Sequence, residues 1–185
     1  MLDVPAEPMR LRDGELVPNA AMFKLPYEKG LDAVGQFHDR LLNFGTYFLI
    51  IDHGMPATTV TSEQTGSTQV PSDPDLVGLF PTTDQFDVVR RVGTDGNGRQ
   101  TNAQIIAWLR RLNETQPFAI IGAGFDFVQG VFFDPLKDPK AVAHLYYSFC
   151  PDAWNAGPAM LEKGPPEDLL AKHLADERTF YCWWD

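Results

Sequence analysis

The chain has 185 residues, of which 44% are hydrophobic and 22% are charged, so it can bury the core of a globular protein. Its formal net charge of -10 argues against nucleic acids and anionic membrane surfaces as partners. The same charge favours a basic protein as the partner, although solubility alone explains it equally well. Residues 1–5 lack the pattern of a secretory signal, and no apolar run approaches the roughly 18 residues that cross a bilayer. We therefore expect a cytoplasmic protein.

The first half of the chain predicts few regular elements. Residues 1–29 hold four prolines, which indicates an extended arm with one short strand at residues 15–17. Apolar residues then recur at helical spacing over 31–42, and the run at 46–51 predicts a strand that is covered on both faces. Residues 57–74, rich in Thr, Ser, Gln and Pro, form either a long functional loop or polar edge strands.

The second half predicts an alternation of strands and helices. Residues 86–92 are expected to form a strand, and Thr101 with Gln104 matches the capping box of a helix. Two strands at 118–121 and 125–133 follow, joined by a hairpin turn at 122–124. Asp138 and Pro139 start a further helix, and Pro165 with Pro166 opens the last one. Residues 179–184 predict a final, buried strand, because an exposed aromatic tail would promote aggregation.

This order is a split β-α-β-β-α-β, ferredoxin-like arrangement with one inserted helix. The helix and strand at 31–51 are expected to extend the same sheet. The predicted fold class is α+β, with residues 1–185 forming a single domain. Its parts are the arm at 1–29, the helix, strand and polar loop at 30–85, and a core at 86–185.

Cysteines and histidines give little indication of catalysis. Cys150 and Cys182 are the two cysteines, and we interpret them as structural buried thiols, although their spacing permits a disulfide. The four histidines are scattered singly, without the spacing of a metal site. Cys150, together with Asp152 and a distant histidine, is the weak candidate for a metal site. No cofactor is predicted.

Aspartates and tryptophans are the candidate binding residues. Asp152 follows a proline that ends a helix, where backbone amides can hydrogen-bond a carboxylate. Tryptophan is enriched at recognition surfaces. A purely structural role is the alternative for each of these side chains. The predicted binding residues are Asp152, Trp154, Asp126, Trp183 and Asp185.

Several sequence motifs in the second half resemble one protein family. They are Thr94-Asp95-Gly96-Asn97, Ile105-Ile106-Ala107-Trp108-Leu109, Ile121-Gly122-Ala123-Gly124, Phe149-Cys150-Pro151-Asp152 and Tyr181-Cys182-Trp183-Trp184-Asp185. Over roughly residues 92–185 they resemble the bacterial family known as domain of unknown function 4253. The chain departs from that family at Asn155-Ala156-Gly157, and by lacking a tyrosine near Asn97. The resemblance implies no activity.

No constellation of residues supplies a nucleophile, a base and an orienting group together. We therefore predict a non-catalytic module that binds a protein or a small ligand, and whose acidity suits it to neutralising a basic protein. The alternative is a hydrolase or transferase that uses Asp152 and Asp126 with a histidine, in a pocket lined by Trp154 and Trp183.

Overall fold

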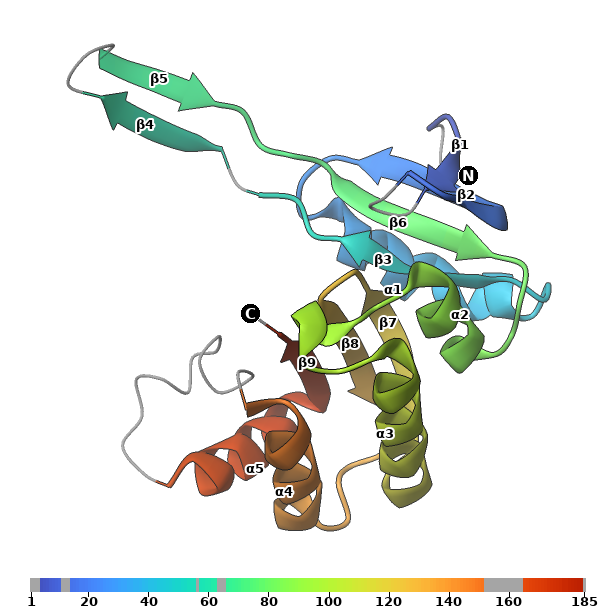
Figure 1. Cartoon of the computed structure of the whole chain (residues 1–185), viewed down its shortest axis with the longest axis vertical. Coiled ribbons are helices and arrows are strands. Elements are labelled where there is room, and N and C mark those ends of the chain that lie inside the picture. Colours follow the sequence, from blue (N-terminus) through green and yellow to red (C-terminus); the bar gives the residue numbers. More distant parts are fainter. Residues whose placement is uncertain (1–3, 11–13, 56, 63–65, 152–164, 185) are drawn as a thin grey trace. The chain divides into compact units, whose positions relative to one another are not determined.

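The computed structural model describes residues 4–10, 14–55, 57–62, 66–151 and 165–184. The chain divides into two compact units, which are residues 1–83 and residues 84–185. The elements of both units are labelled in Figure 1. Together they make the mixed α+β fold that the sequence predicts.

The first unit is built from strands and one long helix. Its strands are β1 (Glu7–Arg10), β2 (Leu16–Leu25), β3 (Tyr47–Asp52), β4 (Thr58–Ser62), β5 (Gly66–Val70) and β6 (Asp75–Phe80). Four of them are neighbours in the order β1-β2-β6-β3, with antiparallel pairing throughout. Helix α1 (Lys29–Leu42) packs against β3 and β6. The expected arm at residues 1–29 is therefore wrong in part, since it contains β1 and a ten-residue β2.

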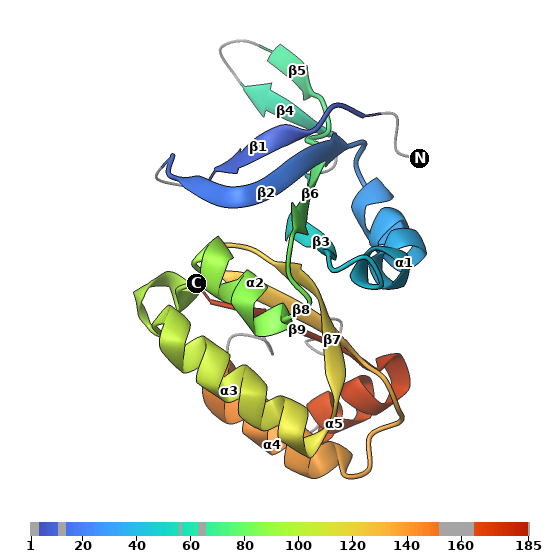
Figure 2. The same cartoon turned by 90° about the vertical axis from the view of Figure 1, so that its right-hand side faces the viewer.

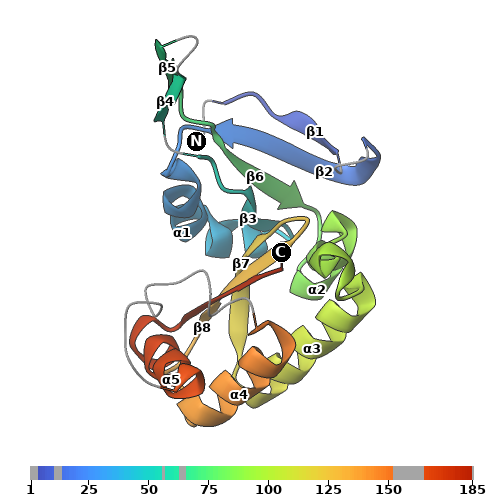
Figure 3. The ribbon, with the colours of Figure 1, turned by 60° about the vertical axis from the view of Figure 1, so that its left-hand side comes forward.

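The polar segment after β3 forms strands, which was one of its two predicted states. β4 and β5 pair antiparallel from Thr58 opposite Val70 to Ser62 opposite Gly66. This hairpin is a separate two-stranded sheet, visible as the ribbon of β4 and β5 in Figure 3. The β-propensity of its threonines and valines agrees with that state.

A buried carboxylate holds three elements of the first unit together. Asp75, at the start of β6, is 3% exposed. Its two oxygens accept hydrogen bonds from the amides of Gly30 at 2.7 Å and Gly54 at 2.9 Å. These bonds satisfy donors at the beginning of α1 and beyond the end of β3. A buried carboxylate needs such partners, and here they are backbone amides.

The second unit has an open sheet of antiparallel strands and several helices. In chain order they are α2 (Gln85–Val92), the 3-10 turn η1 (Gly96–Gly98), α3 (Asn102–Thr115), β7 (Phe118–Ala123), β8 (Phe127–Phe132), α4 (Pro139–Phe149), α5 (Pro166–Glu177) and β9 (Thr179–Trp183). β8 lies between β7 and β9 and pairs antiparallel with both. Helices α3 and α4 run side by side (Figure 2).

The strand predicted at residues 86–92 is wrong, because these residues form α2. The side chain of Asp84 caps the helix by accepting from the amide of Phe86 at 2.9 Å. One turn later, Asp87 forms ion pairs with Arg90 and Arg91, at 2.7 and 2.8 Å. Capping and these pairs outweigh the strand preference of the valines. The second unit therefore lacks the first strand of the expected ferredoxin-like alternation.

Aromatic side chains from α3, α4 and all three strands form a cluster within the core of the second unit. The ring of Trp108 stacks on that of Phe149, with centroids 4.7 Å apart and planes within 7°. Phe180 of β9 packs edge to face against Phe118, at 4.9 Å. Opposite Phe180, β8 carries Gly130, where a Cβ atom would lie 2.4 Å from the Phe180 ring. Only glycine leaves room for this ring.

Candidate functional site

The segment after α2 is tied to the turn between β7 and β8. Thr94 is fully buried, and its hydroxyl donates to the carbonyl oxygen of Gly124 at 2.6 Å. The amide of Asp95 donates to the carbonyl oxygen of Phe125 at 3.0 Å. Asn102, in the first turn of α3, donates to the carbonyl oxygen of Thr94 at 2.9 Å. Two loops that lie far apart in the sequence are thus joined by hydrogen bonds to backbone atoms.

The end of β9 reaches the same turn. Phe127 pairs with Trp183 across β8 and β9, and the amide of Trp184 donates to the carbonyl oxygen of Asp126 at 3.0 Å. This last hydrogen bond continues the pairing of β8 with β9 by one residue beyond the end of β9. The tryptophans of the C-terminal motif therefore lie beside the β7–β8 turn.

The indole of Trp184 is buried in this region. The residue is 1% exposed, and its ring meets that of Phe149 edge to face, at 6.1 Å. Gly96 has a left-handed φ of 59°, and a Cβ atom there would lie 3.5 Å from Cδ2 of Trp184 and 2.9 Å from Cβ of Gln100. A side chain at position 96 would be strained by its φ and would crowd Gln100. Glycine therefore lets the backbone pass close to the indole.

The one polar atom of this indole has no hydrogen-bond partner among the described residues. Among the side chains that the structure describes, Nε1 of Trp184 is the buried nitrogen or oxygen with no hydrogen-bond partner. In contrast, Nε1 of the buried Trp108 donates to the carbonyl oxygen of Leu145 at 3.2 Å. Leaving a buried donor unpaired costs about 1–3 kcal/mol, so such an atom in a native fold requires an explanation.

The outer edge of β9 is covered by α4. The hydroxyl of Tyr146 donates to the carbonyl oxygen of Tyr181 and accepts from the Tyr181 amide at 3.1 Å. One helical turn further, the thiol of Cys150 donates to the carbonyl oxygen of Trp183 at 3.2 Å. Burial is the main cause that raises the pKa of Tyr146 and of Cys182 well above their usual values. Both groups therefore stay protonated and neutral near pH 7.

We define the Trp184 site as residues 94–96, 124–126, 149–150 and 183–184. It contains one buried indole donor that lacks a partner among the described residues, the aromatic surface of the half-buried Trp183, and the half-buried residues Asp95 and Asp126. The indole N–H can donate to a hydrogen-bond acceptor, and the two carboxylates and the Trp183 ring can attract a positive charge. They fit recognition better than nucleophilic chemistry, which needs an activated nucleophile beside a base.

The structure brings together two of the five predicted binding residues. Asp126 and Trp183 meet at the Trp184 site, where the Asp126 carbonyl receives the amide that follows Trp183. Asp152, Trp154 and Asp185 lie outside the described residues. That these five residues bind a partner stays a prediction.

The cysteines are reduced, buried thiols, as expected. Within the described ranges, no group of three or more His, Cys, Asp or Glu side chains is arranged to hold a metal ion. Asp152, the other proposed ligand beside Cys150, is outside those ranges. The histidine on α4, His144, lies 3.3 Å from the carboxylate of Glu167 on α5 and is exposed. The hydrolase or transferase alternative stays a prediction.

Of the helices in the described ranges, none has the length and apolar character to span a membrane.

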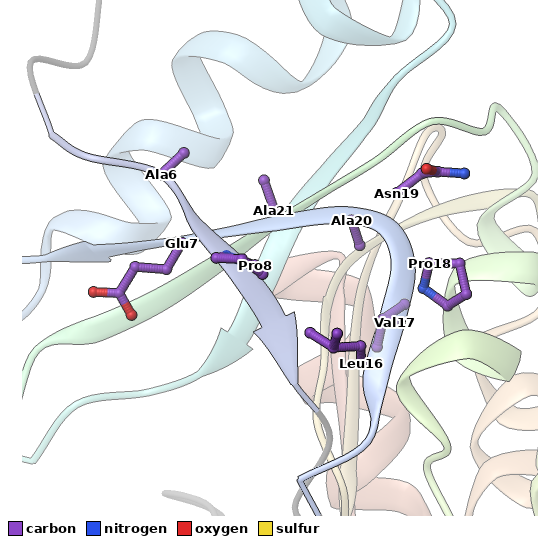
Figure 4. A pocket seen from close by; sticks show the side chains of 9 residues that line it. All are labelled: Ala6, Glu7, Pro8, Leu16, Val17, Pro18, Asn19, Ala20 and Ala21. Carbon is purple, nitrogen blue, oxygen red and sulfur yellow. The ribbon is translucent and has the colours of Figure 1, made fainter.

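A shallow apolar groove lies in the first unit, between β1 and β2 (Figure 4). It has a volume of about 440 Å³ and is lined by residues 6–8 and 16–21. Leu16, which is 49% exposed, contributes to its wall. Its one charged residue, Glu7, forms an ion pair with Lys24 at 3.1 Å. None of the predicted site residues lines this groove, so we place the candidate site at Trp184.

Sequence reasoning missed the groups that build the Trp184 site. Thr94 forms a hydrogen bond to the backbone of Gly124, 30 positions away in the sequence, and Tyr146 to that of Tyr181, 35 positions away. No local pattern indicates such contacts. That the Trp184 indole lacks a partner among the described residues is likewise a tertiary property. One signal was present: the five motifs quoted for the family resemblance include Thr94, Gly124, Cys150 and Trp184, which the fold brings together.

Comparison with known proteins places the Trp184 site within one family domain. A family model described as Domain of unknown function (DUF4253) matches residues 76–185, more than half of the chain. The match begins within β6 and contains every residue of the Trp184 site. It also starts earlier than the resemblance over 92–185 that the motifs indicated. No curated protein and no solved structure matches the chain.

Proposed function

The chain belongs to the DUF4253 family, and we propose that it is a non-catalytic binding module which holds a basic segment of a partner protein at the Trp184 site. One observation carries this proposal. Nε1 of Trp184 is a buried donor with no acceptor among the described residues. Binding would first have to uncover the indole, and a carbonyl oxygen of the partner would then satisfy the donor and recover about 1–3 kcal/mol.

Charge supports a basic segment rather than an acidic one. The chain carries a net charge of -10, and two aspartates, Asp95 and Asp126, lie within the site, half-buried. An anion placed beside the indole would be repelled by these carboxylates, whereas a lysine or arginine would be attracted. An acidic surface also speeds the encounter with a basic partner at low salt.

The half-buried Trp183 supports an arginine in particular. A guanidinium over a tryptophan ring gains about 0.5–1 kcal/mol at an exposed position, and more when water is excluded. Trp183 lies next to Trp184, and its strand partner Phe127 directly follows Asp126. Because consecutive strand residues alternate between faces, the arginine would contact the Trp183 ring on one side of the end of the strand, while a neighbouring part of the segment contacts Asp126 and the indole donor.

Peptides of defined charge test this proposal. We would measure the binding of Arg-rich, Lys-rich, uncharged and Glu-rich peptides of equal length to the purified chain by calorimetry at two salt concentrations. We expect the Arg-rich peptides to bind most tightly and the Glu-rich peptides not to bind. Binding should weaken as salt rises, because the attraction between exposed charges is screened.

Two variants with matched controls locate the site. Asp126→Asn should weaken the binding of Arg-rich peptides, whereas Asp134→Asn, an equal loss of charge at an exposed position, should change it much less. Trp184→Phe should weaken binding, whereas Trp108→Phe, at a tryptophan whose indole is already paired, should not. Equal effects of Asp126→Asn and Asp134→Asn, or no preference for basic peptides, would contradict the proposal.

A further inference from the structure

The last turn of α4 and the strand β9 bring both cysteines of the chain into one buried cluster. Tyr146 bonds to the backbone of Tyr181, and Cys150 bonds to the carbonyl oxygen of Trp183. Cys182 lies between those two strand residues. Its thiol is fully buried, as is that of Cys150.

The two thiols lie in the same place in the fold. The thiol of Cys150 donates to the carbonyl oxygen of Trp183, the residue that follows Cys182, at 3.2 Å, and the proximity of Cys150 contributes to the raised pKa of the Cys182 thiol. A disulfide needs its two sulfurs about 2.05 Å apart, and the Cys150 thiol already contacts the backbone next to Cys182. Cys150 follows the last residue of α4, so it can adjust without breaking the helix interior.

We propose that Cys150 and Cys182 are a redox-sensitive pair, converted to an intramolecular disulfide by a peroxide or a small-molecule disulfide. With hydrogen peroxide, the first sulfur attacks the peroxide, becomes a sulfenic acid and releases one water molecule. The second thiol attacks that sulfur, forms the S–S bond and releases a second water molecule. Two thiols and one peroxide thus give one disulfide and two waters.

The fold controls when this reaction occurs. The thiolate is the reactive species, and the buried surroundings of Cys182 favour its thiol form. An oxidant also cannot reach a sulfur with no exposed surface. Oxidation therefore requires the end of α4 to separate briefly from β9. The pair stays reduced in a reducing compartment and responds to oxidant when this contact opens.

The disulfide would change the contact between α4 and β9. Cys150 would lose its S–H donor to the Trp183 carbonyl, and a covalent bond would join the helix end to the strand. The cross-link would close the chain from residue 150 to residue 182, which includes α5. Closing such a loop restricts the unfolded chain, so the oxidised protein should melt at a higher temperature.

Mass spectrometry of the unaltered chain tests the proposal. The reduced protein is incubated with oxidised glutathione or hydrogen peroxide, unfolded in the presence of a maleimide, and weighed intact. We expect a monomer that is lighter by two hydrogen atoms and carries no maleimide, together with a proteolytic fragment that joins Cys150 to Cys182. Low concentrations of urea should accelerate its formation, and dithiothreitol should reverse it.

Other products would overturn the proposal. They are two maleimide-labelled thiols after long exposure, glutathione bound to either cysteine, added oxygen, or disulfide-linked dimers as the main species. The variants Cys150→Ser and Cys182→Ser supply a second test, because each should yield a glutathione adduct in place of the two-hydrogen loss. If either variant fails to fold, the measurement on the unaltered chain still decides the outcome.

Discussion

The hydroxyl of Tyr146 and the backbone of Tyr181 form a reciprocal pair, in which the hydroxyl donates to the carbonyl oxygen and accepts from the amide. An edge strand exposes alternate amides and carbonyls that can pair with another chain. Here one side chain of α4 occupies both groups of Tyr181, and Cys150 occupies the next outward carbonyl, that of Trp183. Helix α4 therefore protects this part of the edge of β9, and fixes the strand that carries the tryptophan motif.

Removing the Tyr146 hydroxyl should destabilise the second unit. Tyr146→Phe leaves the Tyr181 amide and carbonyl without this partner, and we expect a loss of about 1–3 kcal/mol in the free energy of unfolding. Urea unfolding followed by circular dichroism measures it. Tyr147→Phe, at the next position of α4, is the matched control and should cost less. Equal losses for both variants would show that the reciprocal pair contributes nothing to stability.

Trp108 and Trp184, the buried tryptophans among the described residues, should respond differently to loss of their N–H groups. Trp108→Phe breaks a hydrogen bond to the Leu145 carbonyl oxygen. Trp184→Phe removes a donor that has no hydrogen-bond partner among the described residues. Because the change in ring size is the same, we expect Trp108→Phe to cost about 1 kcal/mol more. Chemical denaturation of both variants gives the difference. A larger loss for Trp184→Phe would mean that its indole is paired in solution.

Stability should fall in alkali, and Cys182 should contribute to the fall. Burial raises the folded pKa of Cys182 above its ordinary value of 9.0. The unfolded chain therefore releases a proton near pH 9 that the folded chain retains, so this contribution is complete below pH 9 and is lost as pH rises toward the folded pKa. The maximum slope is about 1.4 kcal/mol per pH unit for one proton.

A variant separates this contribution from that of Tyr146, whose pKa is also raised. Cys182→Ala should lower stability at pH 7 but flatten its decline above pH 9. Urea midpoints at a series of pH values measure both effects. A decline in the variant as steep as that in the unaltered chain would show that the Cys182 thiol does not titrate with unfolding.

In the first unit, Asp75 should contribute more to stability than a neighbouring exposed aspartate. Asp75→Asn replaces one acceptor oxygen with an amide group that faces a backbone donor, at either Gly30 or Gly54. Hydrogen bonds to charged groups contribute about 1.5–3 kcal/mol each, and we expect a loss of this size. Asp73→Asn, at an exposed position, is the control. Thermal melting of the two variants should separate them clearly, and equal midpoints would exclude the role assigned to Asp75.

Local signals in the sequence were sufficient to locate several helices. The reciprocal capping box of Thr101 and Gln104 is present at the start of α3. Asp138 caps α4 by accepting from the amide of Ala141 at 3.0 Å. In both cases, the groups that define the helix start lie within three residues of one another. Such local interactions are readable without knowledge of the fold.

Segments with competing signals were predicted less well. Residues 86–92 contain three valines, which favour a strand, yet Asp84 caps them as α2 and four apolar side chains of the helix are buried. β6 was not predicted, although Val77, Gly78 and Phe80 are buried in it. Here the packing of the whole unit decides the outcome, and local preference only biases it.

The Trp184 site could be predicted only as a set of motifs. The sequence supplied Asp126 and Trp183 as candidates, but it gave no reason to place them together. Their proximity depends on the pairing of β8 with β9, and on the bond from the Trp184 amide to the Asp126 carbonyl. The unpaired indole depends in turn on what surrounds it in three dimensions.

Nuclear magnetic resonance of the tryptophan indoles tests the central claim most directly. The chain is labelled with nitrogen-15 at tryptophan and titrated with the Arg-rich peptides, and each indole signal is assigned with its Trp→Phe variant. We predict that the Trp184 N–H signal moves downfield as peptide saturates the protein, because its donor gains an acceptor, while the signal of Trp108 stays in place. A Trp184 signal that is unchanged at saturation would contradict the proposed binding site.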